Sequence, residues 1–125
     1  YCGRHGCIET WVSGLSFEAR YAEHKGVELK AAEIMALKRK GDHLANLVWR
    51  RYIDRLARGL ATIVNALDPD VFVMGGGMSN IDELYEDLPP ALAARTFSTV
   101  FHTPILRNRH GDASGVRGAA WLWKD

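Results

Sequence analysis

The sequence predicts an α/β fold that is incomplete within these 125 residues. A short apolar run over residues 71–74 ends in three glycines and precedes a helical pattern, which is typical of the carboxyl end of a parallel strand. A long amphipathic pattern, typical of a helix, lies just before this run. Only one further strand can be found, and two strands do not form a self-sufficient sheet.

Composition describes an ordinary globular protein, with 47% hydrophobic and 25% charged residues. The formal net charge is +1 and the basic residues are scattered, so we expect no nucleic-acid or membrane partner. The sequence shows neither a signal peptide nor an apolar run of about 18 residues, which predicts a cytoplasmic protein. The chain opens at Tyr1 inside a cysteine motif, and we therefore expect a carboxyl-terminal piece of a longer polypeptide.

The first half is predicted to be helical. We expect helices over residues 8–13 and 15–24, interrupted at Gly14 and closed by Gly26, and another over 30–40. Asp42 should cap a long helix to about Leu67, where Pro69 stops it. The side chains expected to face the core are Trp11, Val12, Leu15, Phe17 and Tyr21, then Leu44, Leu47, Val48, Tyr52, Leu56, Leu60, Ile63, Val64 and Leu67.

The second half alternates strands and helices. Residues 71–74 should form a strand that is buried on both faces, and 104–107 a second strand. Ser79 or Asn80 is predicted to cap a helix to about residue 88, where Pro89 and Pro90 break it before it can resume over 91–97. A last helix is expected over 116–123.

The glycines at 75–77 allow two interpretations. A strand, a glycine loop and a helix N-terminus can seat a nucleotide at the carboxyl end of a sheet. The same residues can also form a tight turn without a ligand. The segment is neither a P-loop nor a dinucleotide fingerprint, because no G-x-x-x-x-G-K-[ST] occurs and Asn80 stands where the third fingerprint glycine should be.

Two features near the start are also open to more than one interpretation. Cys2 and Cys7 are separated by a loop with two glycines, and they could be zinc ligands, a disulfide or simple thiols. Glu9 lies in the first turn of a predicted helix, where a carboxylate is favoured by the helix dipole without any further role.

Three motifs in order resemble the ROK family of repressors and sugar kinases. Residues 2–9 (CGRHGCIE) resemble the end of its C-x-C-G-x-x-G-C-x-E signature, and 67–77 resemble its L-D-P…G-G-G segment. Residues 111–120 are similar to its closing G-x-x-x-G-x-x-G-A-A. The resemblance covers nearly the whole chain and implies the C-terminal lobe of an actin-like ATPase (ribonuclease H-like) fold, incomplete here.

The resemblance divides the chain and assigns its site residues. It implies that 1–9 end a zinc loop, that 10–67 form a helical segment, and that 70–125 form the nucleotide side of the lobe. Cys2 and Cys7 match two ligands of a structural zinc ion, Glu9 matches a glutamate that binds sugar hydroxyls, and Gly75, Gly76 and Gly77 match the nucleotide loop. The catalytic aspartate and the phosphate loop of the family lie upstream, so no catalytic residue is expected in this chain.

The function implied is that of an ATP-dependent hexose kinase that uses Mg²⁺, with fructokinase as the nearest match, forming a homodimer as a full-length protein. The fragment alone is expected to be inactive. The alternatives are a kinase for mannose, glucose, N-acetylglucosamine or N-acetylmannosamine, a sugar-responsive repressor of the same family, and a zinc-stabilised interaction module without activity.

Overall fold

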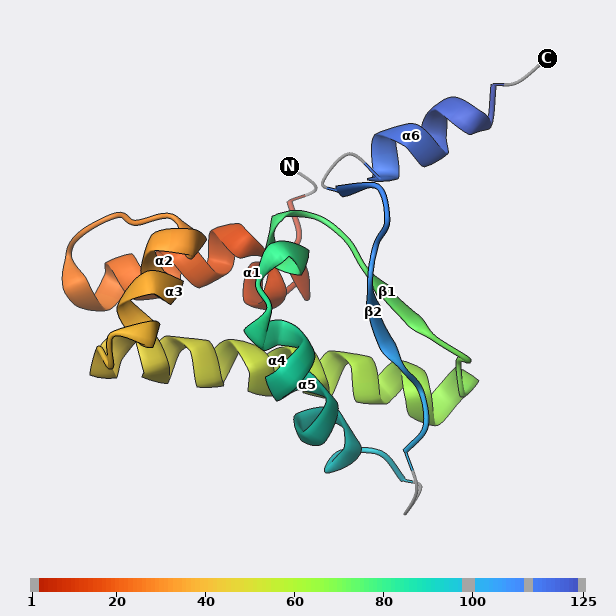
Figure 1. The fold of residues 1–125 in the computed structure, drawn as a ribbon, viewed down its shortest axis with the longest axis horizontal. Coiled ribbons are helices and arrows are strands. Elements are labelled where there is room, and N and C mark those ends of the chain that lie inside the picture. The colour runs from red at the N-terminus through yellow and green to blue at the C-terminus, as the bar shows by residue number, and fades with distance from the viewer. Residues whose placement is uncertain (1–2, 98–100, 112–113, 124–125) are drawn as a thin grey trace.

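The computed structural model describes residues 3–97, 101–111 and 114–123, and its centre is the long helix α4 (His43–Leu67). Four other helices pack against α4: α1 (Glu9–Val12), α2 (Gly14–Lys25), α3 (Ala31–Arg39) and α5 (Glu83–Ala93). In Figure 1, α2 and α3 lie over the first half of α4, and the strands β1 (Phe72–Met74) and β2 (Ile105–Arg107) lie near its second half.

The ends of α4 follow the prediction. The Asp42 carboxylate accepts a hydrogen bond from the Ala45 N–H at 2.8 Å, as an N-cap does. The helix ends at Asp68, which takes a left-handed conformation with φ 44° while its N–H binds the carbonyl of Val64. Aspartate tolerates this conformation better than most residues, and Pro69 prevents the helix from continuing.

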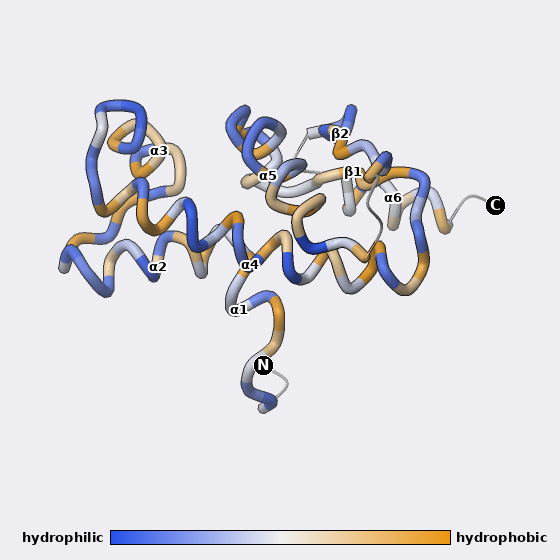
Figure 2. Tube along the Cα trace, turned by 90° about the horizontal axis from the view of Figure 1, so that it is seen from below, coloured by the Kyte–Doolittle hydropathy of each residue, from blue (hydrophilic) through white to orange (hydrophobic). Residues whose placement is uncertain are grey.

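The predicted apolar face of α4 is only partly correct. Val48, Tyr52, Leu56 and Val64 are buried, but Leu67 is 74% exposed. Because α4 is covered by α2 and α3 as well as by α5, its buried surface is wider than a single stripe, and Figure 2 shows apolar and polar residues alternating along it. The buried residues that the single stripe missed are Ala45, Trp49, Ile53, Ala57 and Ala61.

An aromatic cluster joins α2 to α4. The rings of Trp49 and Tyr52 stack with centroids 5.6 Å apart, and Phe17 meets Tyr52 at 5.5 Å and Trp49 at 5.9 Å, edge to face. Such pairs add about 0.5–1.5 kcal/mol each beyond the area they bury. The indole N–H of Trp49 donates to the Asp87 carboxylate at 2.6 Å, so the same residue also ties α4 to α5.

The break between α1 and α2 lies at Ser13 and not at Gly14. Ser13 is extended and caps α2 by accepting a hydrogen bond from the Ser16 N–H at 3.1 Å. This break separates the faces of the two helices, so Trp11 and Leu15 are exposed where the sequence predicted core residues. The indole of Trp11 lies instead against two guanidinium groups, which come from Arg20 and Arg55.

The strands β1 and β2 pair in parallel, with Phe72 opposite Ile105 and Met74 opposite Arg107. The two strands were predicted, but burial of β1 on both faces was wrong. Phe72 and Met74 pack toward the helices, whereas Val73 points to the other face and is 62% exposed. Leu106, which lies opposite Val73 on β2, is also 51% exposed, so among the described residues this face of the strands is largely open.

The segment after β1 differs most from the prediction. A 3₁₀ turn over Gly77–Asn80 follows the glycines, and α5 begins only at Glu83, so neither Ser79 nor Asn80 caps it. The helix then continues through Pro89 and Pro90. Prolines remove two helical hydrogen bonds, but the burial of Leu84, Leu88 and Leu92 against α4 holds the helix together.

The remaining elements follow the sequence closely. The predicted helix at 30–40 is α3, and Gly26 closes α2 in a left-handed conformation with φ 72°. The last helix, α6 (Ser114–Trp121), projects away from the others in Figure 1. In the part of the chain that the structure describes, no helix is long and apolar enough to cross a membrane.

An ion pair fastens α3 to α5. The Arg39 guanidinium donates to both carboxylate oxygens of Glu83, at 2.7 and 2.9 Å. These hydrogen bonds hold the pKa of Glu83 below its usual value. The charged form of Glu83 is therefore stabilised by folding, and its contribution to stability is present above the ordinary glutamate pKa and is lost as the pH falls through the lowered one.

We predict that Glu83→Gln in the full-length protein lowers the melting temperature at pH 7. The difference from the wild type should shrink as the pH falls, because the wild-type carboxylate then becomes protonated too. Thermal melts between pH 3 and pH 7 measure this. Glu86→Gln, on the same helix and exposed, is the control and should show no such trend. A pH-independent difference for Glu83→Gln would contradict the prediction.

Candidate functional site

The glycine loop over residues 75–77 joins β1 to the 3₁₀ turn. Gly76 has φ 73° and ψ 179°, a left-handed backbone conformation that side chains rarely adopt, so this position needs glycine. A Cβ added at Gly75, Gly76 or Gly77 would meet no atom within 4 Å. The packing of the described chain therefore does not explain why positions 75 and 77 are glycine. The outer side of the loop is open to another molecule.

The loop forms one wall of a cavity with a volume of about 580 Å³. This is within the usual size range of small-molecule sites. The opposite walls come from the start of α2, around Ser13 and Gly14, and from the start of α3, around Lys30. The floor comes from α4, through Tyr52 and Leu56.

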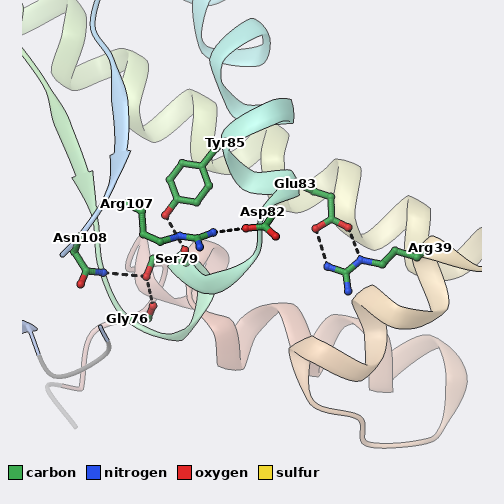
Figure 3. Close-up of polar contacts among 8 residues, drawn as sticks. All are labelled: Arg39, Gly76, Ser79, Asp82, Glu83, Tyr85, Arg107 and Asn108. Carbon is green, nitrogen blue, oxygen red and sulfur yellow. Dashed lines mark hydrogen bonds and ion pairs between the residues drawn. The ribbon is translucent and has the colours of Figure 1, made fainter. Parts of the chain in front are cut away.

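Hydrogen bonds behind the loop fix its shape, as Figure 3 shows. The Ser79 hydroxyl donates to the Gly76 carbonyl at 2.7 Å, and the Ser79 N–H donates to the same oxygen at 3.0 Å. The Asn108 side-chain amide donates to the Met74 carbonyl at 2.9 Å and to the Ser79 hydroxyl at 3.1 Å. Asn108 follows β2, so the end of the second strand holds the loop that follows the first.

The start of α5 braces this network from the other side. The Tyr85 hydroxyl donates to the Ser79 carbonyl at 2.7 Å. Arg107, the last residue of β2, lies over the Tyr85 ring and donates to the Asp82 carboxylate at 2.6 Å. The loop is thus anchored by β2 and by α5 while its other side remains open.

Glu9 lies outside this cavity, whose wall begins at Val12. It is the first residue of α1, it is exposed, and its carboxylate makes no hydrogen bond with a described residue. The turn before it is held by Thr10, whose N–H and hydroxyl donate to the Cys7 carbonyl at 3.0 and 2.6 Å. Glu9 and the glycine loop therefore do not line the same cavity in the described residues.

The predicted zinc ligands are only partly visible. Cys2 lies outside the described residues, and Cys7 is an exposed free thiol. Across residues 3–97, 101–111 and 114–123, no three His, Cys, Asp or Glu side chains are grouped so that they could hold a metal ion. One thiol does not satisfy tetrahedral zinc, so the described residues do not by themselves fit that ion.

Three residues that line the cavity, Glu18, Lys30 and Tyr52, were not predicted as site residues from the sequence. Glu18 on α2 accepts hydrogen bonds from the Lys30 ammonium at 3.1 Å and from the Ala31 N–H at 3.0 Å, which fastens the start of α3 to the cavity wall. Tyr52 was assigned only to the core. A hydroxyl on an otherwise apolar helix face was the one feature of the sequence that could have indicated a binding role for Tyr52. No feature of the residues next to Glu18 and Lys30 indicates such a role.

A profile described as the ROK family matches residues 1–125. This chain belongs to the ROK family. Among curated relatives, the N-acetyl-D-glucosamine kinase of Photobacterium profundum is 44% identical over 121 residues, which are 97% of this chain and 40% of the relative. The N-acetyl-D-glucosamine kinase of Shigella boydii serotype 4 is 42% identical, again over 97% of this chain and 40% of the relative. The chain thus spans about two fifths of these relatives.

Solved structures of ROK proteins resemble the chain closely. The ROK family glucokinase from Streptomyces griseus, in complex with glucose and AMPPNP, matches with a TM-score of 0.82 and 25% identity over 97% of this chain and 45% of that one. The ROK hexokinase from Thermus thermophilus matches with a TM-score of 0.80 and 28% identity, over 97% and 41%. The predicted fold class, an incomplete part of an actin-like ATPase fold, is confirmed.

Proposed function

We propose that this chain is part of an ATP-dependent hexose kinase whose sugar is N-acetyl-D-glucosamine. The observation that carries the kinase proposal is the glycine loop, open on one side and forming a wall of a cavity of nucleotide size. For the sugar, the sequence resemblance pointed to fructose. The relatives at 44% and 42% identity are N-acetyl-D-glucosamine kinases, so this sugar replaces fructose as the proposed substrate.

In the proposed reaction a sugar hydroxyl attacks the γ-phosphorus of ATP, the bond to the β–γ bridging oxygen breaks, and ADP leaves. The hydroxyl proton passes to a general base, which the family resemblance places upstream of this chain. Such catalysis depends mainly on positioning and on charge neutralisation. This chain would contribute the nucleoside end of the ATP site and Glu9 of the sugar site.

The cofactors follow from this division. Mg²⁺ usually binds one or two carboxylates together with the phosphates of the nucleotide. The family resemblance places the phosphate loop upstream of this chain, so we propose that the protein ligands of Mg²⁺ lie there. A structural zinc ion held in part by Cys2 and Cys7, a homodimer and a cytoplasmic location stay predictions of the sequence.

We predict that the full-length protein phosphorylates N-acetyl-D-glucosamine with a higher kcat/KM than it does fructose, glucose, mannose or N-acetylmannosamine. Coupled measurement of ADP release with each sugar tests this, with ATP alone as the background. A higher kcat/KM for fructose would restore the sugar inferred from the sequence. The absence of sugar-dependent ADP release with every sugar would overturn the kinase proposal and favour the repressor.

We predict that Gly77→Ala in the full-length enzyme keeps the wild-type melting temperature but raises the KM for ATP by about tenfold, equal to 1.4 kcal/mol. The added methyl group meets nothing in the described chain and would crowd a bound nucleotide. Gly76→Ala is the contrast, because its left-handed backbone should cost about 1–2 kcal/mol of stability. An unchanged KM for ATP in Gly77→Ala would indicate a turn without a ligand.

We predict that Glu9→Gln lowers kcat/KM for the sugar by about 10- to 150-fold. This is the equivalent of a charge-assisted hydrogen bond worth about 1.5–3 kcal/mol. The Glu9 carboxylate has no described partner, so its oxygens remain available to hydroxyl donors. Steady-state kinetics with varied sugar measure the loss, and Glu28→Gln, also exposed, is the control. If Glu9→Gln changes only the melting temperature, the carboxylate serves the helix dipole alone.

A further inference from the structure

Tyr52 combines deep burial with an unused polar atom. Its side chain is 4% exposed, and its hydroxyl makes no hydrogen bond with a described residue. Yet among the described residues no fully buried side-chain oxygen or nitrogen lacks a partner, so this hydroxyl must reach accessible space. Tyr52 lines the cavity beside the glycine loop.

The core fixes where this hydroxyl lies. The Tyr52 ring stacks on Trp49 and meets the edge of Phe17, so the aromatic cluster sets its orientation before any ligand binds. Burial raises the pKa of Tyr52 to about 12. At neutral pH the phenol therefore keeps its proton and can donate a hydrogen bond. A rigid donor of this kind loses little conformational entropy when it binds a ligand.

The rest of the cavity indicates which part of a nucleotide lies there. Beside Tyr52 the wall is largely apolar, which suits a flat heteroaromatic ring better than a phosphate. The polar groups nearby already have partners, since Glu18 binds Lys30 and the Ser79 hydroxyl binds Gly76. The apolar side chains of the wall are Val12, Leu15, Leu56, Met74, Met78 and Leu84.

We propose that Tyr52 is a nucleotide-binding residue whose hydroxyl donates a hydrogen bond to a ring nitrogen of the adenine base. This inference rests on the proposed nucleotide role of the cavity and adds a contact that distinguishes adenine from other bases. A hydroxyl left without this partner would face an apolar ring, so a base lacking an acceptor nitrogen at that point is disfavoured.

The test uses Tyr52→Phe in the full-length protein, because this change removes the hydroxyl and keeps the ring. Calorimetric titration with a non-hydrolysable ATP analogue should show binding weakened by about 2- to 12-fold, the range for a neutral hydrogen bond. The KM for ATP should rise by a similar factor, while the KM for sugar and the melting temperature stay at wild-type values. Tyr21→Phe is the matched control, because Tyr21 is equally buried in the core but does not line the cavity.

A change in the ligand tests the same contact without a second mutation. The 1-deaza, 3-deaza and 7-deaza forms of ATP each replace one ring nitrogen by carbon. With the wild type, one of these analogues should bind more weakly than ATP. With Tyr52→Phe, the same analogue and ATP should bind with equal affinity. Wild-type affinity for ATP in Tyr52→Phe, or an equal loss in Tyr21→Phe, would overturn the role of Tyr52 while leaving the kinase proposal intact. Failure of the wild type to bind any nucleotide would overturn both.

Discussion

Packing against α4 is the constraint on which the other described elements depend. This helix contacts α2, α3 and α5, and its Trp49 reaches both α2, through Phe17, and α5, through Asp87. The same helix supplies the floor of the cavity through Tyr52 and Leu56. Core and candidate site are therefore built from one set of side chains, and a change in the position of α4 would alter both.

The glycine loop shows how a loop can be open and rigid at once. Hydrogen bonds from Ser79, Asn108 and Tyr85 hold the loop and the turn that follows it. A Cβ added at any of the three glycines would nevertheless meet no atom within 4 Å. The backbone can thus keep one conformation while presenting peptide groups without side chains to a ligand, which is the use that glycine serves in such sites.

Local signals in the sequence were sufficient for much of the fold. The Asp42 cap, the Pro69 stop and the Gly26 closure depend on neighbouring residues alone, and all three predictions were correct. Predictions failed where distant contacts decide the outcome. The prolines of α5 do not break the helix because leucines on either side of them are buried against α4, and Val73 lies on a face of the sheet that the described residues leave largely exposed.

The residues of the candidate site also divide into those that the sequence indicated and those that only distant contacts make important. The glycines were identified from their position after an apolar run, and the resemblance named Glu9, Cys2 and Cys7. Asn108 and Glu18 were not identified, because their importance comes from partners far away in the sequence. No pattern in the residues next to them indicates such a contact. Tyr52 was recognised only as part of an apolar face, since periodicity reports the direction of a side chain and not the state of its hydroxyl.

The bond between Asn108 and Met74 spans 34 residues of sequence and has a consequence for the order of folding. Contacts between α3 and α4, such as that of Lys38 with Trp49, close a much shorter segment, and short closures form sooner because they restrict the chain less. Closing a 34-residue loop costs about 3 kcal/mol of chain entropy before any contact compensates for it. The glycine loop should therefore reach its final shape after α3 has packed on α4, when β2 pairs with β1. A nascent chain would thus pair these two helices before the loop proposed to bind a nucleotide takes shape.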